Sequence, residues 1–380
     1  MRKKGVSFLL CAVLAVTALA GCGGGTAASQ TEKAAETQGE TSAGQAQTET
    51  AAENSSEAAE SSNVAEDSGK TAAELKPSNW PKSPISLMVG SAAGGGTDIM
   101  ARMLAEAMNM DVAVNIINRN GASGTIAAEE TAVSAPDGYT INVGMPAAYY
   151  IQPHLVDLTY DPFGDFRHIA VISPDEPLVI VVPVESSYES FSQVEEDMKG
   201  GKAINFGTSN PGSVGNCGLS DLFLQAGVYE SLTMLPFGGS AETLTALQGG
   251  HIDVCTLDLA EALPRVNNGT LRALAVFGSQ RCPSLPDVPC TEELGYKDLD
   301  YVIAFKWISV PRDTPEEIVA YLKAVFNEAV LSDTYADYIK SLNGLDTYTL
   351  TEEELTDKLK GCYDSYDGIL RKIGTHKELK

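Results

Sequence analysis

The stretch from Val89 to Asp98 constrains the fold of this chain most, because it holds three consecutive glycines between two patterned segments. The apolar run Ile85–Val89 predicts a buried strand, and the apolar spacing that starts at Ile99 predicts a helix. Glycine has no Cβ atom, so a ligand can reach backbone N–H groups at the positive end of a helix dipole. The pattern predicts a site for a small anion. The alternative is a tight turn in which Asp98 only caps the helix.

The glycine spacing excludes the common nucleotide-binding loops. A dinucleotide fingerprint that starts at Gly94 requires a glycine where the chain has Ile99, and the complete P-loop motif Gly-x-x-x-x-Gly-Lys-Ser/Thr occurs nowhere. We therefore predict no cofactor. Nucleic acid is also excluded as a partner, because 51 acidic against 26 basic residues give a formal charge of −25. A local array of amides can still bind an anion, since salt screens distant charges.

The first 22 residues predict an export signal. Basic residues at positions 2–4 precede the apolar run Val6–Ala20, which is too short to span a membrane. The sequence Leu19-Ala20-Gly21-Cys22 resembles a bacterial lipobox, which implies cleavage before Cys22 and a lipid on its thiol. We expect a protein held by that lipid at the outer face of the cytoplasmic membrane. The alternative is an ordinary cleaved secretion signal.

The segments that follow predict a stalk and two domains. Residues 23–83 are rich in Ala, Glu, Thr and Ser and poor in large apolar side chains, which is typical of a disordered stalk. Alternating strand and helix patterns then favour parallel sheets. We assign residues 84–182 plus 303–380 to one domain and 183–302 to the other, with a hinge near Pro183 and Tyr301.

A second loop repeats the arrangement of the first. The strand Ala203–Phe206 leads into the glycine- and hydroxyl-rich segment Gly207–Asn216, and a helix pattern follows. At ten residues this connection is longer than is usual between a strand and a helix, which favours a functional role. Two such loops, one in each domain, could close on one ligand from opposite sides.

The candidate catalytic residues give only weak support to an enzymatic function. A nucleophile would have to be Ser209, Ser213 or Cys217, yet neither serine lies in a Gly-x-Ser-x-Gly motif. Asp98 and Asp258 could form an acid–base pair, but aspartates at strand ends are more often caps or turn residues. We predict a binding protein, not an enzyme.

Metal binding is not predicted either. No Cys-x-x-Cys motif occurs, and the four histidines are scattered along the chain. Five cysteines remain after the signal, so at least one is unpaired. Cys282 and Cys290 flank a proline-rich loop and could form a disulfide, a question that spacing leaves open.

Several motifs together resemble the Bug family, the extracytoplasmic substrate-binding receptors of tripartite tricarboxylate transporters. The matching segments, in order, are Pro84-Ile85, Ala92–Asp98, Asn118–Gly124, Pro136–Thr140, Asp161-Pro162, Asp165-Phe166 and Leu285–Pro289. The resemblance implies an α/β fold of two domains, as in type II periplasmic binding proteins, joined by crossing strands with the ligand cleft between them. It also implies that the protein hands its ligand to integral-membrane permease subunits, and we expect a monomer.

The resemblance implies that backbone amides of the two loops hold a ligand carboxylate. The candidate ligand-binding residues are Ala92, Ala93, Gly94, Gly95, Gly96, Thr97 and Asp98 in the first loop, Thr208, Ser209, Asn210, Gly212, Ser213 and Val214 in the second, and Phe237 and Asp258. The chain departs from its relatives at Phe237–Gly239, where they often have Tyr-Lys-Gly, and at Asn216, where a histidine is common. The resemblance implies a di- or tricarboxylate, and these departures add a monocarboxylate or an amino acid as further options.

These observations predict a lipid-anchored solute-binding protein that captures a small carboxylate and delivers it to a permease. The alternative is a lipoprotein that binds a similar ligand and presents its closed form to a sensor kinase. The sequence does not separate the two.

Overall fold

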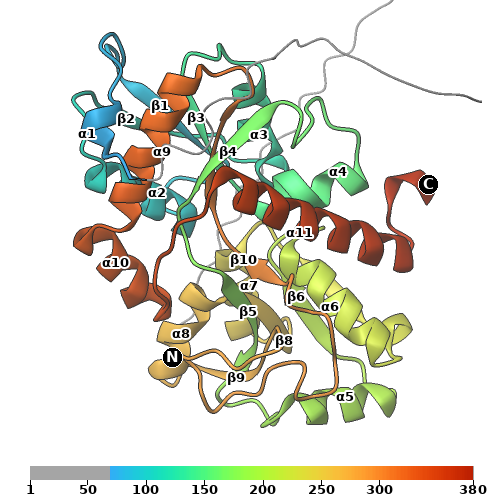
Figure 1. The fold of residues 1–380 in the computed structure, drawn as a ribbon. Helices are drawn as coiled ribbons and strands as arrows, with labels where there is room; N and C mark the ends of the chain where they lie inside the picture. The colour runs from blue at the N-terminus through green and yellow to red at the C-terminus, as the bar shows by residue number, and fades with distance from the viewer. Residues whose placement is uncertain (1–68, 380) are drawn as a thin grey trace, which may run out of the picture. The chain divides into compact units, whose positions relative to one another are not determined.

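The computed structural model of this chain describes residues 69–379, which form two β-sheets flanked by helices (Figure 1). The predicted signal segment, with Cys22, and most of the predicted stalk lie outside the described residues. None of the helices within residues 69–379 is long and apolar enough to cross a membrane.

The first sheet has five strands in the order β2-β1-β3-β11-β4. They are β1 Ile85–Val89, β2 Val114–Asn118, β3 Thr140–Gly144, β4 Phe166–Val171 and β11 Trp307–Pro311. β1 pairs in parallel with β2 and β3, whereas β11 lies antiparallel between β3 and β4. The predicted strand, loop and helix around the three glycines are confirmed, because α2 (Gly96–Ala107) follows β1.

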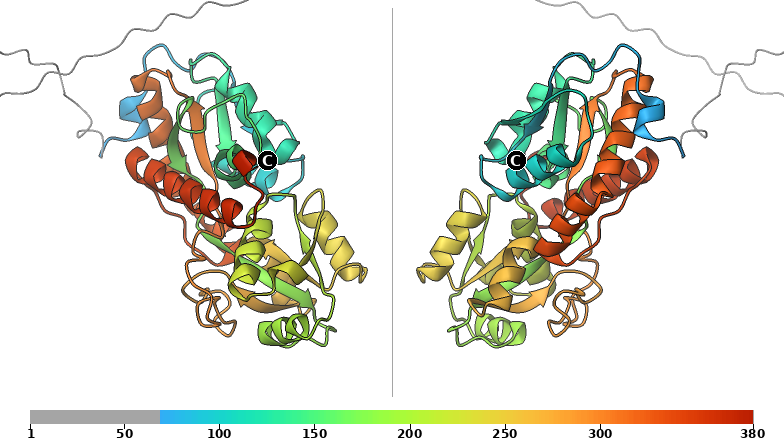
Figure 2. Two further views of the ribbon diagram at one scale, coloured as in Figure 1. Left: turned by 90° about the vertical axis from the view of Figure 1, so that its right-hand side faces the viewer. Right: turned by 90° about the vertical axis from the view of Figure 1, so that its left-hand side faces the viewer.

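Helices cover the first sheet and join it to the second. α2, α3 (Thr125–Ala132), α9 (Glu316–Val330) and α10 (Asp333–Asn343) belong to the first lobe. Leu104 of α2 and Leu322 of α9 are fully buried in one core with Leu87 of β1. The long helix α11 (Glu352–Lys372) packs against β4 of the first sheet and against α6 of the second lobe (Figure 2).

The second sheet has six strands, ordered β10-β5-β8-β6-β7 with β9 paired to β5. They are β5 Glu176–Pro183, β6 Asn205–Thr208, β7 Thr233–Pro236, β8 Val254–Asp258, β9 Leu271–Val276 and β10 Ile303–Ala304. The helices of this lobe are α5 Phe191–Lys199, α6 Val214–Gln225, α7 Ser240–Gln248 and α8 Leu259–Asn267. β6 pairs in parallel with β7 and β8, so all three strands end at the same edge of the sheet.

The chain crosses between the sheets at two places that differ from the expected hinge. β5, which the sequence analysis assigned to the first domain, pairs with β8 and β9 in the second sheet. The first crossing is therefore residues 172–175, between β4 and β5, and the second is residues 305–306, between β10 and β11. Pro183 ends a strand because proline has no N–H to donate, but it does not mark a change of sheet.

The folded part begins earlier than the expected stalk boundary at residue 83. The short helix α1 (Ala72–Leu75) is attached to α9, since the Ala72 N–H donates to Glu328 Oε1 at 2.7 Å. Trp80 is buried against the rings of Tyr139 and Tyr321. These contacts attach the segment to the first lobe, and the polar average composition of residues 23–83 does not reveal them.

The C-terminal helices begin in different ways. Thr351 and Glu354 form a capping box at the start of α11. α9 starts after Pro315, and the Thr314 hydroxyl donates to the Pro311 carbonyl at 2.7 Å. The thiols of Cys282 and Cys290 are both buried and are not bonded to each other.

Candidate functional site

The first loop presents unoccupied amides at the start of α2. Gly95 is the residue before the helix, and its N–H donates to the Ala92 carbonyl at 3.1 Å. Ala92, Ala93, Gly94 and Gly96 are exposed. Among the hydrogen bonds of residues 69–379, none uses the N–H groups of Gly96, Thr97 or Asp98. These are the donors that a helix N-terminus leaves for an anion.

Asp98 shapes this loop from inside. Its carboxylate is buried and accepts from the Gly94 N–H at 2.8 Å, from Asn118 Nδ2 at 2.9 Å and from Arg102 Nη2 at 2.9 Å. Burial opposes its charge, but Arg102, Gly94 and Asn118 outweigh burial and lower the pKa of Asp98. Because both of its carboxylate oxygens already accept hydrogen bonds, Asp98 holds the loop in shape.

The second loop has the same design at the start of α6. Ser213 caps this helix, since its Oγ accepts from the Asn216 N–H at 3.2 Å. No hydrogen bond among the described residues uses the N–H groups of Val214 or Gly215. Thr208, at the end of β6, is fully buried, and its Oγ1 has no hydrogen-bond partner.

The second loop also touches the first lobe. Gly212 has a φ of +64°, and a Cβ atom there would lie 2.5 Å from Leu155 Cδ1 in α4 (Gln152–Leu155). The left-handed φ and this close approach both favour glycine here. Ser209 and Asn210 are half-buried beside it, and the Asn210 carbonyl accepts from the Ser213 N–H at 3.2 Å.

The remaining candidates lie at the same edge of the second sheet. Thr208, Phe237 and Asp258 follow or end the three parallel strands β6, β7 and β8. The Phe237 N–H donates to the Thr208 carbonyl at 2.9 Å, which ties this residue to the second loop. Asp258 is half-buried and lies opposite Leu178 near the start of β5, close to the first crossing.

Charged residues that the sequence analysis missed also gather at the crossings. Glu176 is buried, and its Oε2 accepts from the Ala260 N–H at 3.2 Å. Burial and the charge of Asp258 raise the pKa of Glu176 to about 7. Lys306 is 8% exposed, and its ammonium group has no hydrogen bond or ion pair among the described residues, although its backbone N–H donates to Ser173 Oγ at 2.7 Å. In the sequence, Lys306 is the single charged residue within residues 302–310, and this pattern could have identified it as a functional candidate.

The nucleophile alternatives lack the necessary geometry. Cys217 is fully buried, and burial, followed by the charge of Asp221, raises its thiol pKa to about 12. Ser213 Oγ is engaged as the cap of α6. Within residues 69–379, no hydrogen bond joins Ser209, Ser213 or Cys217 to a histidine.

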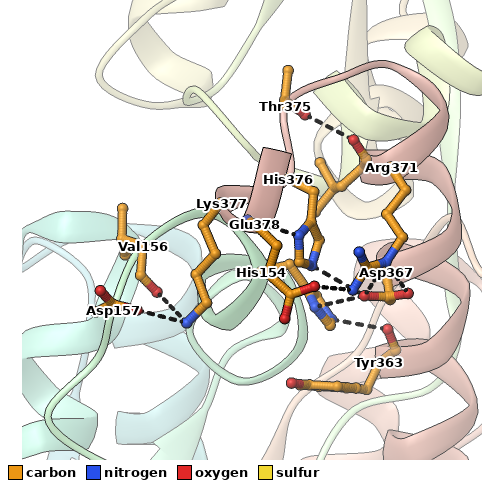
Figure 3. Close-up of polar contacts among 11 residues, drawn as sticks. His154, Val156, Asp157, Tyr363, Asp367, Arg371, Thr375, His376, Lys377 and Glu378 are labelled. Atoms are coloured by element: carbon orange, nitrogen blue, oxygen red, sulfur yellow. Dashed lines mark hydrogen bonds and ion pairs between the residues drawn. The ribbon is translucent and has the colours of Figure 1, made fainter. Parts of the chain in front are cut away.

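One trio of described side chains has metal-ligand spacing. Candidate ligand atoms of His154, Asp367 and His376 lie within 4.8 Å of one another (Figure 3). His376 Nδ1 accepts from the Glu378 N–H at 3.2 Å, so the proton of the neutral ring is on Nε2, which faces Asp367 at 3.1 Å. Arg371 Nε donates to both oxygens of Asp367, at 3.0 and 2.8 Å. This arrangement is a hydrogen-bond network that ties the C-terminal segment to α11.

Comparison with known proteins shows to which family this chain belongs. Residues 100–374 match the family described as tripartite tricarboxylate transporter family receptor, TctC. BugT of Bordetella pertussis is 28% identical over 313 residues, which cover 80% of this chain and 93% of BugT.

Solved structures agree with the sequence comparison. The periplasmic binding protein BugD superposes with a TM-score of 0.70 at 26% identity, over 78% of this chain and 99% of that one. MatC from Rhodopseudomonas palustris, solved with malate, gives a TM-score of 0.66 at 26% identity, over 77% and 100%. A further R. palustris protein, solved with adipate, gives 0.70 at 26%, over 77% and 97%.

The protein has two α/β lobes joined by crossing strands, and its helix-start loops lie at the edges where the sheets meet. This arrangement defines a solute-binding protein of the periplasmic type. The chain belongs to the tripartite tricarboxylate transporter receptor family. It is an extracytoplasmic substrate-binding receptor and not an enzyme.

Proposed function

We propose that this receptor captures a small carboxylate between its two lobes and delivers it to the permease of a tripartite tricarboxylate transporter. The observation that carries the proposal is the pair of loops with unoccupied amides, at Gly96–Asp98 and at Val214–Gly215. Each lies at the start of a helix, where the dipole favours a negative ligand group. Relatives solved with malate and with adipate support a carboxylate as the ligand.

The candidate residues take two roles in this proposal. The free amides within the two loops, at Gly96–Asp98 and at Val214–Gly215, hold the ligand carboxylate. The other candidates of residues 92–98 and 208–214 shape these loops, and Phe237 and Asp258 line the same region from the second lobe. Asp98 supports the first loop through Gly94, Arg102 and Asn118. The lobes divide at residues 172–175 and 305–306, which act as the hinge for closure around the ligand. Closure excludes water, and amide–carboxylate bonds are stronger in a dry site.

The proposal includes a lipid anchor on Cys22. The lipobox supports it, and residues 23–68 supply a spacer between the anchor and the described part of the chain. A Cys22→Ser variant is expected to leave the membrane fraction of the producing cells while the native chain stays in it. Retention of Cys22→Ser in the membrane fraction would contradict the lipid anchor.

A thermal-shift screen of the full chain, extracted in mild detergent, tests the ligand class. The probes are mono-, di- and tricarboxylates and amino acids. A ligand at 100 times its Kd stabilises the folded state by about 2.7 kcal/mol. A rise in Tm confined to carboxylate-bearing compounds supports the proposal. No rise with any of them, together with no competition in equilibrium dialysis, would overturn it.

A further inference from the structure

Two histidines that lie far apart in the chain come together near its C-terminal end (Figure 3). His154 belongs to α4, Asp367 to α11, and His376 to the segment that follows α11. Both imidazole rings are buried, whereas Asp367 is half-buried. Candidate ligand atoms of the three side chains lie within 4.8 Å of one another. Histidines that are scattered in the sequence therefore become neighbours in the folded chain.

The Nδ1 atom of His154 faces the Asp367 carboxylate without a proton between them. His154 Nε2 lies 3.0 Å from the Tyr363 carbonyl oxygen, which can only accept, so Nε2 carries the proton of the neutral ring. Burial favours that neutral ring over the charged imidazolium. The Nδ1 lone pair then lies 3.5 Å from Asp367 Oδ1. Two acceptors at this distance repel each other, and a cation between them would remove the repulsion.

Neighbouring groups orient these side chains as they do in metal sites. A metal-bound histidine almost always donates its other ring N–H to a carbonyl or a carboxylate, and His154 does so with Tyr363. Arg371 Nε donates to both oxygens of Asp367, and its shorter bond is the one to Oδ2, at 2.8 Å. An ion can therefore take Oδ1 while Arg371 continues to hold the carboxylate through Oδ2.

The ion pairs around the three side chains leave an excess of negative charge. The Arg371 guanidinium is bonded to two carboxylates, those of Asp367 and Glu378. The Lys377 ammonium lies 2.9 Å from the carboxylate of Asp157. Three carboxylates thus face two cationic side chains in this group, and the two histidines are neutral. This balance favours a bound cation.

The distances and the donor atoms fit a zinc-type ion. Ligand atoms about 2.0–2.1 Å from a tetrahedral ion lie about 3.4 Å apart. Asp367 Oδ1 lies 3.1 Å from His376 Nε2 and 3.5 Å from His154 Nδ1. Two imidazole nitrogens and a carboxylate oxygen suit Zn²⁺ and its transition-metal neighbours, whereas Ca²⁺ and Mg²⁺ prefer oxygen ligands. A water molecule completes the tetrahedron in such sites.

We propose that His154 Nδ1, Asp367 Oδ1 and His376 Nε2 bind a divalent transition-metal ion of the zinc type, which joins α4, α11 and the C-terminal segment. His376 is the ligand that changes, because its Nε2 proton faces Asp367 while its Nδ1 accepts from the Glu378 N–H. As the ion takes Nε2, that proton passes through solvent to Nδ1, and the N–H of the exposed Glu378 turns to water. None of the three ligands is a candidate carboxylate-binding residue, so this site does not depend on the proposed function.

Zinc titration of the full chain tests the site. The chain, extracted in mild detergent without an affinity tag, is freed of metal with a chelator and titrated with zinc chloride by calorimetry. We expect a single saturable site, a higher Tm with zinc, and slower amide exchange at His376 and Leu379. Co²⁺ should bind with the visible absorption of a four-coordinate ion. Asp367→Asn and His376→Asn should each raise the Kd for zinc at least about tenfold.

Two matched variants separate this site from other side chains that bind zinc. Asp364→Asn changes an exposed aspartate on the same helix, and His251→Asn changes an exposed histidine of the second lobe. Both should bind zinc with native affinity. Melting curves without zinc identify a variant that fails to fold, and the other ligand variant then provides the test. Absence of zinc binding by the native chain, or native affinity in a folded Asp367→Asn or His376→Asn variant, overturns the site.

Discussion

The backbone N–H of Gly94 donates a hydrogen bond to the Asp98 carboxylate, at 2.8 Å from Oδ2. This bond folds the glycine loop back onto the first turn of α2, and Asn118 and Arg102 hold the same carboxylate from its other sides. The Gly94 N–H is therefore already hydrogen-bonded and does not point to a ligand. The amides of Gly96 and Thr97 have no acceptor among the described residues, so the loop is shaped before a ligand arrives.

Gly96→Val is expected to weaken ligand binding strongly while the protein without ligand keeps its stability. A Cβ atom at Gly96 meets nothing within 4 Å, so the fold accepts the side chain, which would then cover the free amides. Gly95 is less suitable for this test, because a Cβ atom there would lie 3.1 Å from the Ala92 carbonyl oxygen. We expect Kd to rise at least about tenfold, a loss of roughly 1.4 kcal/mol, with Tm near the native value.

The matched control is Gly361→Val in α11, where the added Cβ also meets nothing within 4 Å. It reports the cost of valine at an open helix position far from the loop in sequence. Calorimetric titration and thermal melting of both variants provide the comparison. Native affinity in Gly96→Val would remove the first loop from the site.

Glu176→Gln is expected to make the protein less sensitive to pH between about 4.5 and 7. The folded-state pKa of Glu176 is raised to about 7, from 4.5, by burial and by the charge of Asp258. The unfolded chain therefore ionises this group first as the pH rises, and the native protein loses stability through that window. The contribution is about 3 kcal/mol, taking 1.36 kcal/mol per pH unit.

Urea unfolding at several pH values measures this effect as a difference between variant and native chain. The free energy of unfolding of Glu176→Gln should rise relative to native by about 3 kcal/mol from pH 4.5 to pH 7. Glutamine retains an oxygen that accepts from the Ala260 N–H. Glu292→Gln serves as the exposed control and should show no such trend. A flat difference for Glu176→Gln would mean that this carboxyl titrates normally in the folded protein.

Arg371→Ala is expected to loosen the C-terminal segment without unfolding the protein. Arg371 donates to Asp367 and to Glu378, and so joins α11 to the segment that carries His376 (Figure 3). Its side chain is 41% exposed, so the cost in global stability should be only about 0–1 kcal/mol. Amide hydrogen exchange at His376 and Leu379 should accelerate clearly more than exchange in β1.

Lys372→Ala is the control for this variant, because Lys372 is an exposed neighbour on the same helix turn without a partner among the described residues. It should leave exchange in the C-terminal segment at the native rate. Equal exchange rates in Arg371→Ala and Lys372→Ala would show that the network of Arg371, Asp367 and His376 does not hold this segment.

Local chemistry made the two loops predictable. Three glycines between an apolar run and a helical pattern, and a long glycine- and hydroxyl-rich connection after Phe206, each act within about a dozen residues. The helices α2 and α6 begin where these patterns end. The role of Asp98 was less accessible, because it depends on Asn118, twenty residues away on the neighbouring strand.

The sequence by itself determined the strands, the helix-start loops and the family, because apolar periodicity, glycine content and motif order are properties of short segments. Only the tertiary structure decided that β5 and β10 belong to the second sheet, since strand pairing joins residues far apart in the chain. It alone brought Glu176 to Ala260 and placed Lys306 near Glu176 and Glu261. The pKa of each carboxyl group where the two sheets meet depends on burial and on neighbouring charges, which exist only in the folded chain.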